Sequence, residues 1–235
     1  MIRSLCAYLI IAIFMVVCFT PCFFIACLPV RWRYDNRVYF LFAHIFYRVI
    51  NGVLLLPITV EGKENISSEP VIYVANHQSS LDIPLLGSLV DGHPHVWLFW
   101  VKFAKIPIFG FIARRMNIVV DPRGLRKLTG SIDAAVQIIK NTKSHIIIFP
   151  EGGRYIDNKI HNFFYGFAIL AKQTGRPVIP VMMTNVNKIY PPGAFIMHPH
   201  PIRMIIGKPF VFLPDETEDD FVQRVHLWFV EKTVG

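Results

Sequence analysis

The chain has 235 residues, of which 53% are hydrophobic and only 17% are charged. Soluble domains average about 45–50% apolar and about 25% charged residues, so this composition predicts a membrane-associated protein. The net charge of +8 suits an anionic lipid surface, a nucleic acid or a phosphorylated substrate. Because the basic residues form no recognisable nucleic-acid module, we expect no nucleic-acid partner and favour membrane lipid.

The N-terminal region is apolar in two stretches. Leu5–Val30 contains no charged residue and is longer than the roughly 20 residues that span a hydrocarbon core. Arginines are more frequent after this run than before it, so the positive-inside rule places the rest of the chain on the cytoplasmic side. The next stretch, Val38–Leu56, is interrupted by polar residues and fits either an interfacial helix or a helix facing the core of the following domain. We expect residues 1–56 to form a membrane-associated helical segment.

After Pro57 the pattern alternates between short β-rich runs and helical stretches. This alternation predicts one α/β domain over residues 57–235, with a mixed, largely buried sheet flanked by helices. A further helix is expected to end near Lys232. The predicted strands are Ile58–Glu61, Val71–Ala75, His95–Trp100, Asn117–Val120, His145–Phe149, Val178–Met183 and Ile202–Ile206. The other predicted helices are Leu81–Leu89, 124–140 and Phe164–Thr174.

A histidine and an aspartate follow the second predicted strand. His77 lies just after Val71–Ala75, and Asp82 follows five residues later, in the first turn of the next predicted helix. A carboxylate bonded to one imidazole nitrogen fixes the tautomer and raises the basicity of the other nitrogen, as a general base for an alcohol requires. The same spacing also arises when an aspartate merely caps a helix.

A second polar cluster follows the buried strand that ends at Phe149. Gly152 and Gly153 allow the backbone to approach a ligand closely, and the planar guanidinium of Arg154 suits a phosphate. Glu151 is placed to orient that arginine or a substrate hydroxyl. All four cysteines precede residue 28, so the α/β domain has no thiol nucleophile. The histidine–aspartate pair is therefore read as a dyad without a protein nucleophile.

Taken together, these clusters resemble the 1-acylglycerol-3-phosphate acyltransferase family, over about residues 70–185. The Asn-His-x4-Asp block is matched by Asn76, His77 and Asp82, and the Phe-Pro-Glu-Gly-x-Arg block by 149–154. A valine- and proline-bearing strand matches at 178–181. Gly153 stands where the family usually has threonine.

The family's second block differs here, because Asp121 is followed by a proline before Arg123. The resemblance implies that Arg123 binds substrate phosphate, with Arg115 or Arg126 as alternatives. Lys102 and Lys105 lie in a stretch similar to the lysine-rich segment that precedes Pro and Gly in the family. We assign them, with Glu151–Arg154, to substrate binding.

The resemblance implies transfer of a fatty acyl group from acyl-CoA or acyl carrier protein to the sn-2 hydroxyl of 1-acylglycerol 3-phosphate, giving phosphatidic acid. His77 and Asp82 would form the general-base dyad, with no cofactor and no metal. Backbone amides near Gly152 and Gly153 are candidate oxyanion donors. Two alternatives remain open. One is another acceptor, such as a different lysophospholipid, a lyso-aminolipid or glycerol 3-phosphate, and the other is a non-catalytic membrane lipid-binding protein.

Overall fold

A seven-stranded sheet forms the centre of the computed structural model, which describes residues 2–90, 92–121, 123 and 125–234. The strand order is β1-β7-β6-β2-β5-β3-β4. Strands β6, β2, β5, β3 and β4 are parallel, β7 is antiparallel to β6, and β1 is parallel to β7. The strands are β1 Ile58–Glu61, β2 Ile72–Ala75, β3 His95–Trp100, β4 Ile118–Val120, β5 His145–Ile148, β6 Val178–Thr184 and β7 Ile202–Ile206.

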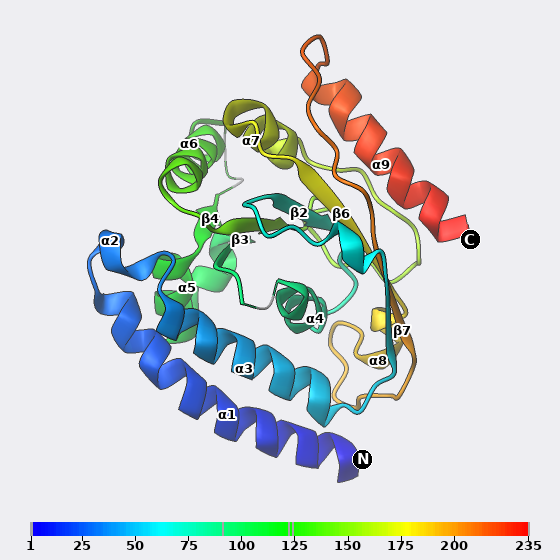
Figure 1. Ribbon diagram of the computed structural model, residues 1–235. Helices are drawn as coiled ribbons and strands as arrows, with labels where there is room; N and C mark the ends of the chain where they lie inside the picture. The colour runs from blue at the N-terminus through cyan, green and yellow to red at the C-terminus, as the bar shows by residue number, and fades with distance from the viewer. Residues whose placement is uncertain (1, 91, 122, 124, 235) are drawn as a thin grey trace.

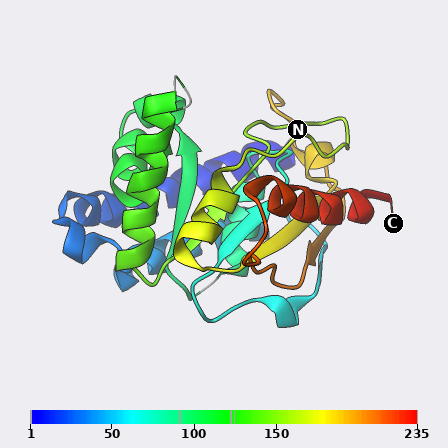
Figure 2. The ribbon, with the colours of Figure 1, turned by 90° about the horizontal axis from the view of Figure 1, so that it is seen from above.

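Helices cover both faces of this sheet (Figure 1). Alternate side chains of each strand point to opposite faces, so Ile72 and Val74 of β2 pack with helices α6, α7 and α9, whereas Tyr73 packs with α4 and α8. The turned view shows α6, α7 and α9 together over one face (Figure 2). The helices are α4 Asp82–Leu89, α5 Phe109–Met116, α6 Leu125–Asn141, α7 Gly166–Thr174, α8 Val186–Ile189 and α9 Glu218–Val234, with short 3-10 turns η1 Lys63–Asn65 and η2 Val101–Lys105.

The N-terminal segment forms two long helices, α1 Ile2–Cys27 and α3 Arg37–Val53, joined through the short α2 Val30–Arg33. Figure 1 shows α1 and α3 side by side, with α3 nearer to α4 and the sheet. Among the described residues, α1 is the helix long and apolar enough to cross a membrane. It also contacts the α/β domain near both ends: the Met197 amide donates to the Ser4 hydroxyl over 3.1 Å, and Arg115 donates to the Ala26 carbonyl over 2.8 Å.

The predicted fold class, a mixed α/β sheet flanked by helices behind an apolar N-terminal helix, is confirmed. Strand β2 is buried along its whole length because helices cover both its faces, and such strands are continuous apolar runs. Helices α5 and α8 were not predicted from the sequence. All five parallel strands end at the same edge of the sheet, and this carboxyl edge carries His77.

Candidate active site

A buried carboxylate organises the turn after β2. Asp82 is fully buried, and its Oδ2 lies 2.7 Å from Nδ1 of His77. The same oxygen accepts hydrogen bonds from the backbone amides of Gln78, at 2.6 Å, and Ser79, at 2.8 Å. Three donors on one oxygen hold the carboxylate as an acceptor, so His77 presents Nδ1–H to it. Nε2 of His77 is then the nitrogen available to accept a proton.

The imidazole of His77 is held on one face as well as at Nδ1. Its ring stacks on Phe149, with centroids 4.0 Å apart and planes 12° from parallel. Trp97 stacks on Phe149 in turn, with centroids 5.8 Å apart. The side chain of His77 retains 16% of its accessible surface, so the ring is positioned by the protein and still reachable by a substrate.

Asn76, the first residue of the histidine motif, has a structural part in this arrangement. Its side-chain amide donates to the Met183 carbonyl over 2.8 Å, and its carbonyl oxygen accepts from the Met183 amide over 2.7 Å. These two bonds extend the β2–β6 pairing by one residue. They fix the backbone from which His77 projects.

Glu151 joins the two polar clusters. One carboxylate oxygen accepts from the backbone amide of His77 over 3.0 Å, and the other accepts from the amide of His161 over 3.1 Å. Burial raises the pKa of Glu151, and these two amide bonds oppose the rise. Since both oxygens are engaged by the backbone, the carboxylate acts in this structure as a clamp between two loops.

Arg154 lies beside the histidine turn. Its Nη1 donates to the hydroxyl of Ser80 over 2.7 Å, and the amide of the next residue, Tyr155, donates to the His77 carbonyl over 3.0 Å. Ser80 lies between His77 and Asp82 in the sequence. The exposed guanidinium is therefore placed within reach of an anion bound near the imidazole.

Gly152 and Gly153 allow aromatic rings to pack closely against the backbone. Gly152 has φ +64°, and a Cβ on it would lie 2.6 Å from the Phe164 ring and 3.2 Å from that of Trp100. A side chain does not fit at this position, because both the backbone conformation and the neighbours oppose it. The Gly152 amide donates to the Phe149 carbonyl over 3.2 Å and so serves the turn. At Gly153 a Cβ would lie 3.2 Å from the Tyr155 ring.

Lys102 and Lys105 extend the site along the carboxyl edge. They belong to η2, directly after β3, and both side chains are exposed. Nζ of Lys102 lies 4.8 Å from the centroid of Trp100, whose ring borders Gly152. The structure therefore brings Lys102 to the same region as the Gly152 turn.

Arg123 is at the same edge of the sheet but farther away. It follows β4, which is three strands from β2, or about 14 Å at the usual strand spacing. Its guanidinium makes a two-point contact with Asp121, at 2.8 and 2.7 Å. Arg115, the alternative, donates to carbonyls at the end of α1. Arg126, the other alternative, is exposed in the first turn of α6.

Two features near these residues were not predicted from the sequence. Ser79 donates from its hydroxyl to the Tyr190 carbonyl over 2.5 Å, which ties the histidine turn to the segment after α8. His161 and Asp157 form a second histidine–aspartate contact, at 3.0 Å, but both side chains are considerably exposed. The Ser79 contact could not be recognised from sequence because it joins segments 111 residues apart. No predicted strand or helix orients the pair of Asp157 and His161, so its spacing alone gave no signal.

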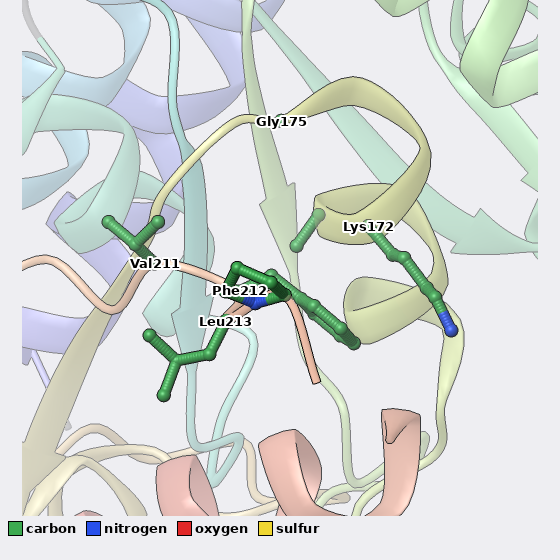
Figure 3. Close-up of a pocket in the computed structure, with 7 residues that line it drawn as sticks. Lys172, Gly175, Val211, Phe212 and Leu213 are labelled. Carbon is green, nitrogen blue, oxygen red and sulfur yellow. The ribbon is translucent and has the colours of Figure 1, made fainter. Parts of the chain in front are cut away.

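A pocket of about 270 Å³ lies elsewhere, between the end of α7 and the segment after β7. Figure 3 shows Lys172, Gly175 and Phe212 around it. Gly175 leads into β6, which is parallel to β2, so this pocket is at the amino edge of the sheet. His77 is at the opposite edge, and the pocket has no part in the dyad.

Known acyltransferases share the sequence pattern and the fold of this chain. The Acyltransferase family model matches residues 57–184, which include both polar clusters. A chloroplast 1-acyl-sn-glycerol-3-phosphate acyltransferase of Arabidopsis thaliana is 32% identical over 178 residues, covering 72% of this chain and 48% of that protein. The Pseudomonas aeruginosa enzyme of the same name is 28% identical over 215 residues, covering 88% of this chain and 79% of that protein.

A similar structure has also been solved. The 1-acyl-sn-glycerophosphate acyltransferase of Thermotoga maritima superposes with a TM-score of 0.77 and 25% identity, covering 99% of this chain and 95% of that one. This chain spans about half the length of the first curated plant relatives that it matches. The α/β fold and the family match define an acyltransferase type of domain. The chain belongs to the Acyltransferase family.

Proposed function

We propose that this protein transfers a fatty acyl group from a thioester donor to the sn-2 hydroxyl of 1-acylglycerol 3-phosphate, producing phosphatidic acid. The observation that carries the proposal is the His77–Asp82 pair, in which a buried carboxylate bonded by two backbone amides lies 2.7 Å from the imidazole. The names of the similar proteins support the acceptor.

In the proposed reaction, Nε2 of His77 takes the proton of the acceptor hydroxyl as the oxygen attacks the thioester carbonyl. Asp82 stabilises the imidazolium that forms. The tetrahedral intermediate collapses by breaking the carbon–sulfur bond, and the departing thiolate takes the proton from His77. Because a thioester is already activated, no acyl-enzyme is required.

We propose that Arg154 holds the phosphate of the acceptor. It is exposed, its guanidinium is hydrogen-bonded to Ser80 next to the dyad, and bidentate donors match phosphate geometry. Lys102 supplies a second positive charge across the Gly152 turn. Arg123, which is paired with Asp121, is proposed to act at the outer end of this basic edge.

The proposed location is the cytoplasmic face of a membrane, with α1 buried in lipid. The apolar composition of α1 supports membrane attachment, and the arginines that follow it support the orientation. Attachment would place the dyad where a lysophospholipid with an acyl chain in the bilayer can reach it. Acyl-CoA or acyl carrier protein would arrive from the aqueous side.

A panel of acceptors and donors tests this function. Purified protein should convert 1-acylglycerol 3-phosphate and acyl-CoA or acyl carrier protein to the diacyl product, and should be much slower with acceptors that lack the phosphate. Equal rates on phosphate-free lyso-lipids would favour the alternative acceptors. Lipid binding without turnover on any member of the panel would support a non-catalytic lipid-binding protein.

A further inference from the structure

A strained turn presents apolar side chains to the surface next to η2. Ile108 has φ +58° and ψ −62°, and the amide of Phe109 donates to the Pro107 carbonyl over 2.6 Å. This is a γ-turn with positive φ, a rare and strained conformation that a β-branched residue adopts at a cost. Ile108 is nevertheless 63% exposed, and Ile106 and Phe109 beside it are also exposed.

A second bulky apolar residue shares both properties. Leu55 has φ +47° and is 84% exposed. The other described non-glycine residues with positive φ are Asp or Asn, which tolerate it far better. Strain of this kind persists where the surrounding structure imposes it, often at functional sites. At these two turns the strained backbone leaves a large apolar side chain exposed to solvent.

Both turns border α1. The Phe109 ring stacks on Phe19, with centroids 6.3 Å apart, and the carbonyl of Leu54 accepts from Arg3. A third exposed apolar segment also borders it, because Phe195 packs on Tyr8 with centroids 5.2 Å apart. Eleven residues, about three helical turns, separate Tyr8 from Phe19, so these two contacts lie on one side of α1.

These segments are also joined along the chain to residues that lie close to the dyad or to the Gly152 turn. The chain that leads to Ile108 starts at Trp100, which borders Gly152. The segment that leads to Phe195 includes Tyr190, whose carbonyl accepts from Ser79. Leu54 lines a small apolar space together with Leu81, the residue before Asp82. We call the exposed apolar residues of the three segments the rim: Leu55, Ile106, Ile108, Phe109, Phe195 and Ile196.

The charges beside the rim match those of a lipid surface. Lys102 and Lys105 are exposed directly before Ile106, and Arg114 is exposed on α5. At the far end of α1, Arg31 lies 4.5 Å from the ring of the exposed Trp32. Exposed apolar side chains flanked by cations and by an aromatic residue are typical of segments that enter an anionic bilayer interface.

We propose that the rim is a second membrane-docking surface, through which the α/β domain inserts its own loops into an anionic phospholipid leaflet around the dyad. The rim segments contact α1 through Tyr8, Phe19 and Arg3, so we expect one leaflet to receive both. The mouth of the site then opens at the level of the lipid headgroups. This docking rests on the proposed membrane attachment and is independent of which acyl acceptor is used.

Fluorescence quenching by brominated lipid tests the insertion. Ile108→Trp is bound to vesicles of dibromostearoyl phosphatidylcholine and phosphatidylglycerol, and its emission is compared with that on unbrominated vesicles. Leu227→Trp on α9 is the matched control, since Leu227 is 57% exposed and α9 covers one face of the sheet, away from α1. We expect brominated lipid to quench a larger fraction of the tryptophan emission in Ile108→Trp than in wild type. In Leu227→Trp the quenched fraction should be smaller than in wild type.

A second variant separates folding from docking. Ile108→Asn removes the β-branch and the exposed apolar surface, so its Tm should not fall while its vesicle binding falls about tenfold. Leu227→Asn should bind vesicles as wild type does. Unchanged binding of Ile108→Asn would overturn the proposal. A quenched fraction for Ile108→Trp no greater than that for Leu227→Trp would also overturn it, because attachment would then run through α1 without the rim.

Discussion

Replacing Asp82 by asparagine isolates the charge of the dyad. The substitution keeps the size of the side chain and one oxygen for the Gln78 and Ser79 amides, but removes the negative charge beside Nδ1 of His77. When the imidazole becomes positive during the reaction, that charge no longer stabilises it. The loss is therefore expected in kcat, because the proposed contacts to the acceptor phosphate are made by other residues.

The magnitude follows from the geometry. Unit charges about 4 Å apart interact by about 4 kcal/mol at an effective dielectric constant of about 20. The 16% exposure of His77 weakens the interaction, so we expect a loss of about 2–4 kcal/mol. At about 1.36 kcal/mol per factor of ten, kcat should fall about 30- to 900-fold.

The assay is steady-state conversion of 1-acylglycerol 3-phosphate to the diacyl product with a saturating thioester donor. Asp157→Asn is the matched control, because it removes the carboxylate from the exposed contact with His161. Exposed pairs contribute little, so Asp157→Asn should stay within about twofold of wild type. The reasoning would be refuted if Asp82→Asn kept a tenth or more of the wild-type kcat, or if Asp157→Asn lost as much.

Two further predictions concern the clamp and the buried imidazoles. Glu151→Gln replaces one acceptor oxygen by an NH₂ donor that faces a backbone amide. Both Tm and kcat should therefore fall. If Glu151 only bound substrate, KM would rise and Tm would stay unchanged. Burial lowers the pKa of His95 to about 3 and that of His145 to about 4. The unfolded chain therefore binds more protons below about pH 6.5, and the free energy of unfolding should fall by about 1 kcal/mol per pH unit for each histidine between about pH 6 and 4. Urea titrations at pH 7 and 5 that gave the same stability would contradict this.

The sheet could be predicted from sequence because most of its strands are buried on both faces. Ile72–Ala75 and His145–Ile148 are short apolar runs bounded by loop residues, and helices cover them from both sides. The turn between β2 and α4 was predictable for a related reason. A histidine after the strand and an aspartate at the start of the helix are separated by only a few residues, so local geometry brings them together.

The far neighbours of the dyad could not be predicted in this way. Spacing along the chain does not reveal that β4 is three strands from β2, which determines how far Arg123 lies from His77. The clamp by Glu151 depends on the packing of two loops. The positive φ of Ile108 is likewise hidden, because local preferences argue against it and only the surrounding fold imposes it.

His77→Ala in the acyl-transfer assay tests the proposed general base directly. Wild-type protein should form phosphatidic acid from 1-acylglycerol 3-phosphate and an acyl thioester. His77→Ala should keep its fold and its vesicle binding, while turnover falls by about 10²–10⁴-fold. Turnover by His77→Ala within about tenfold of wild type would contradict the account, because general-base catalysis is worth about 10²–10⁴-fold.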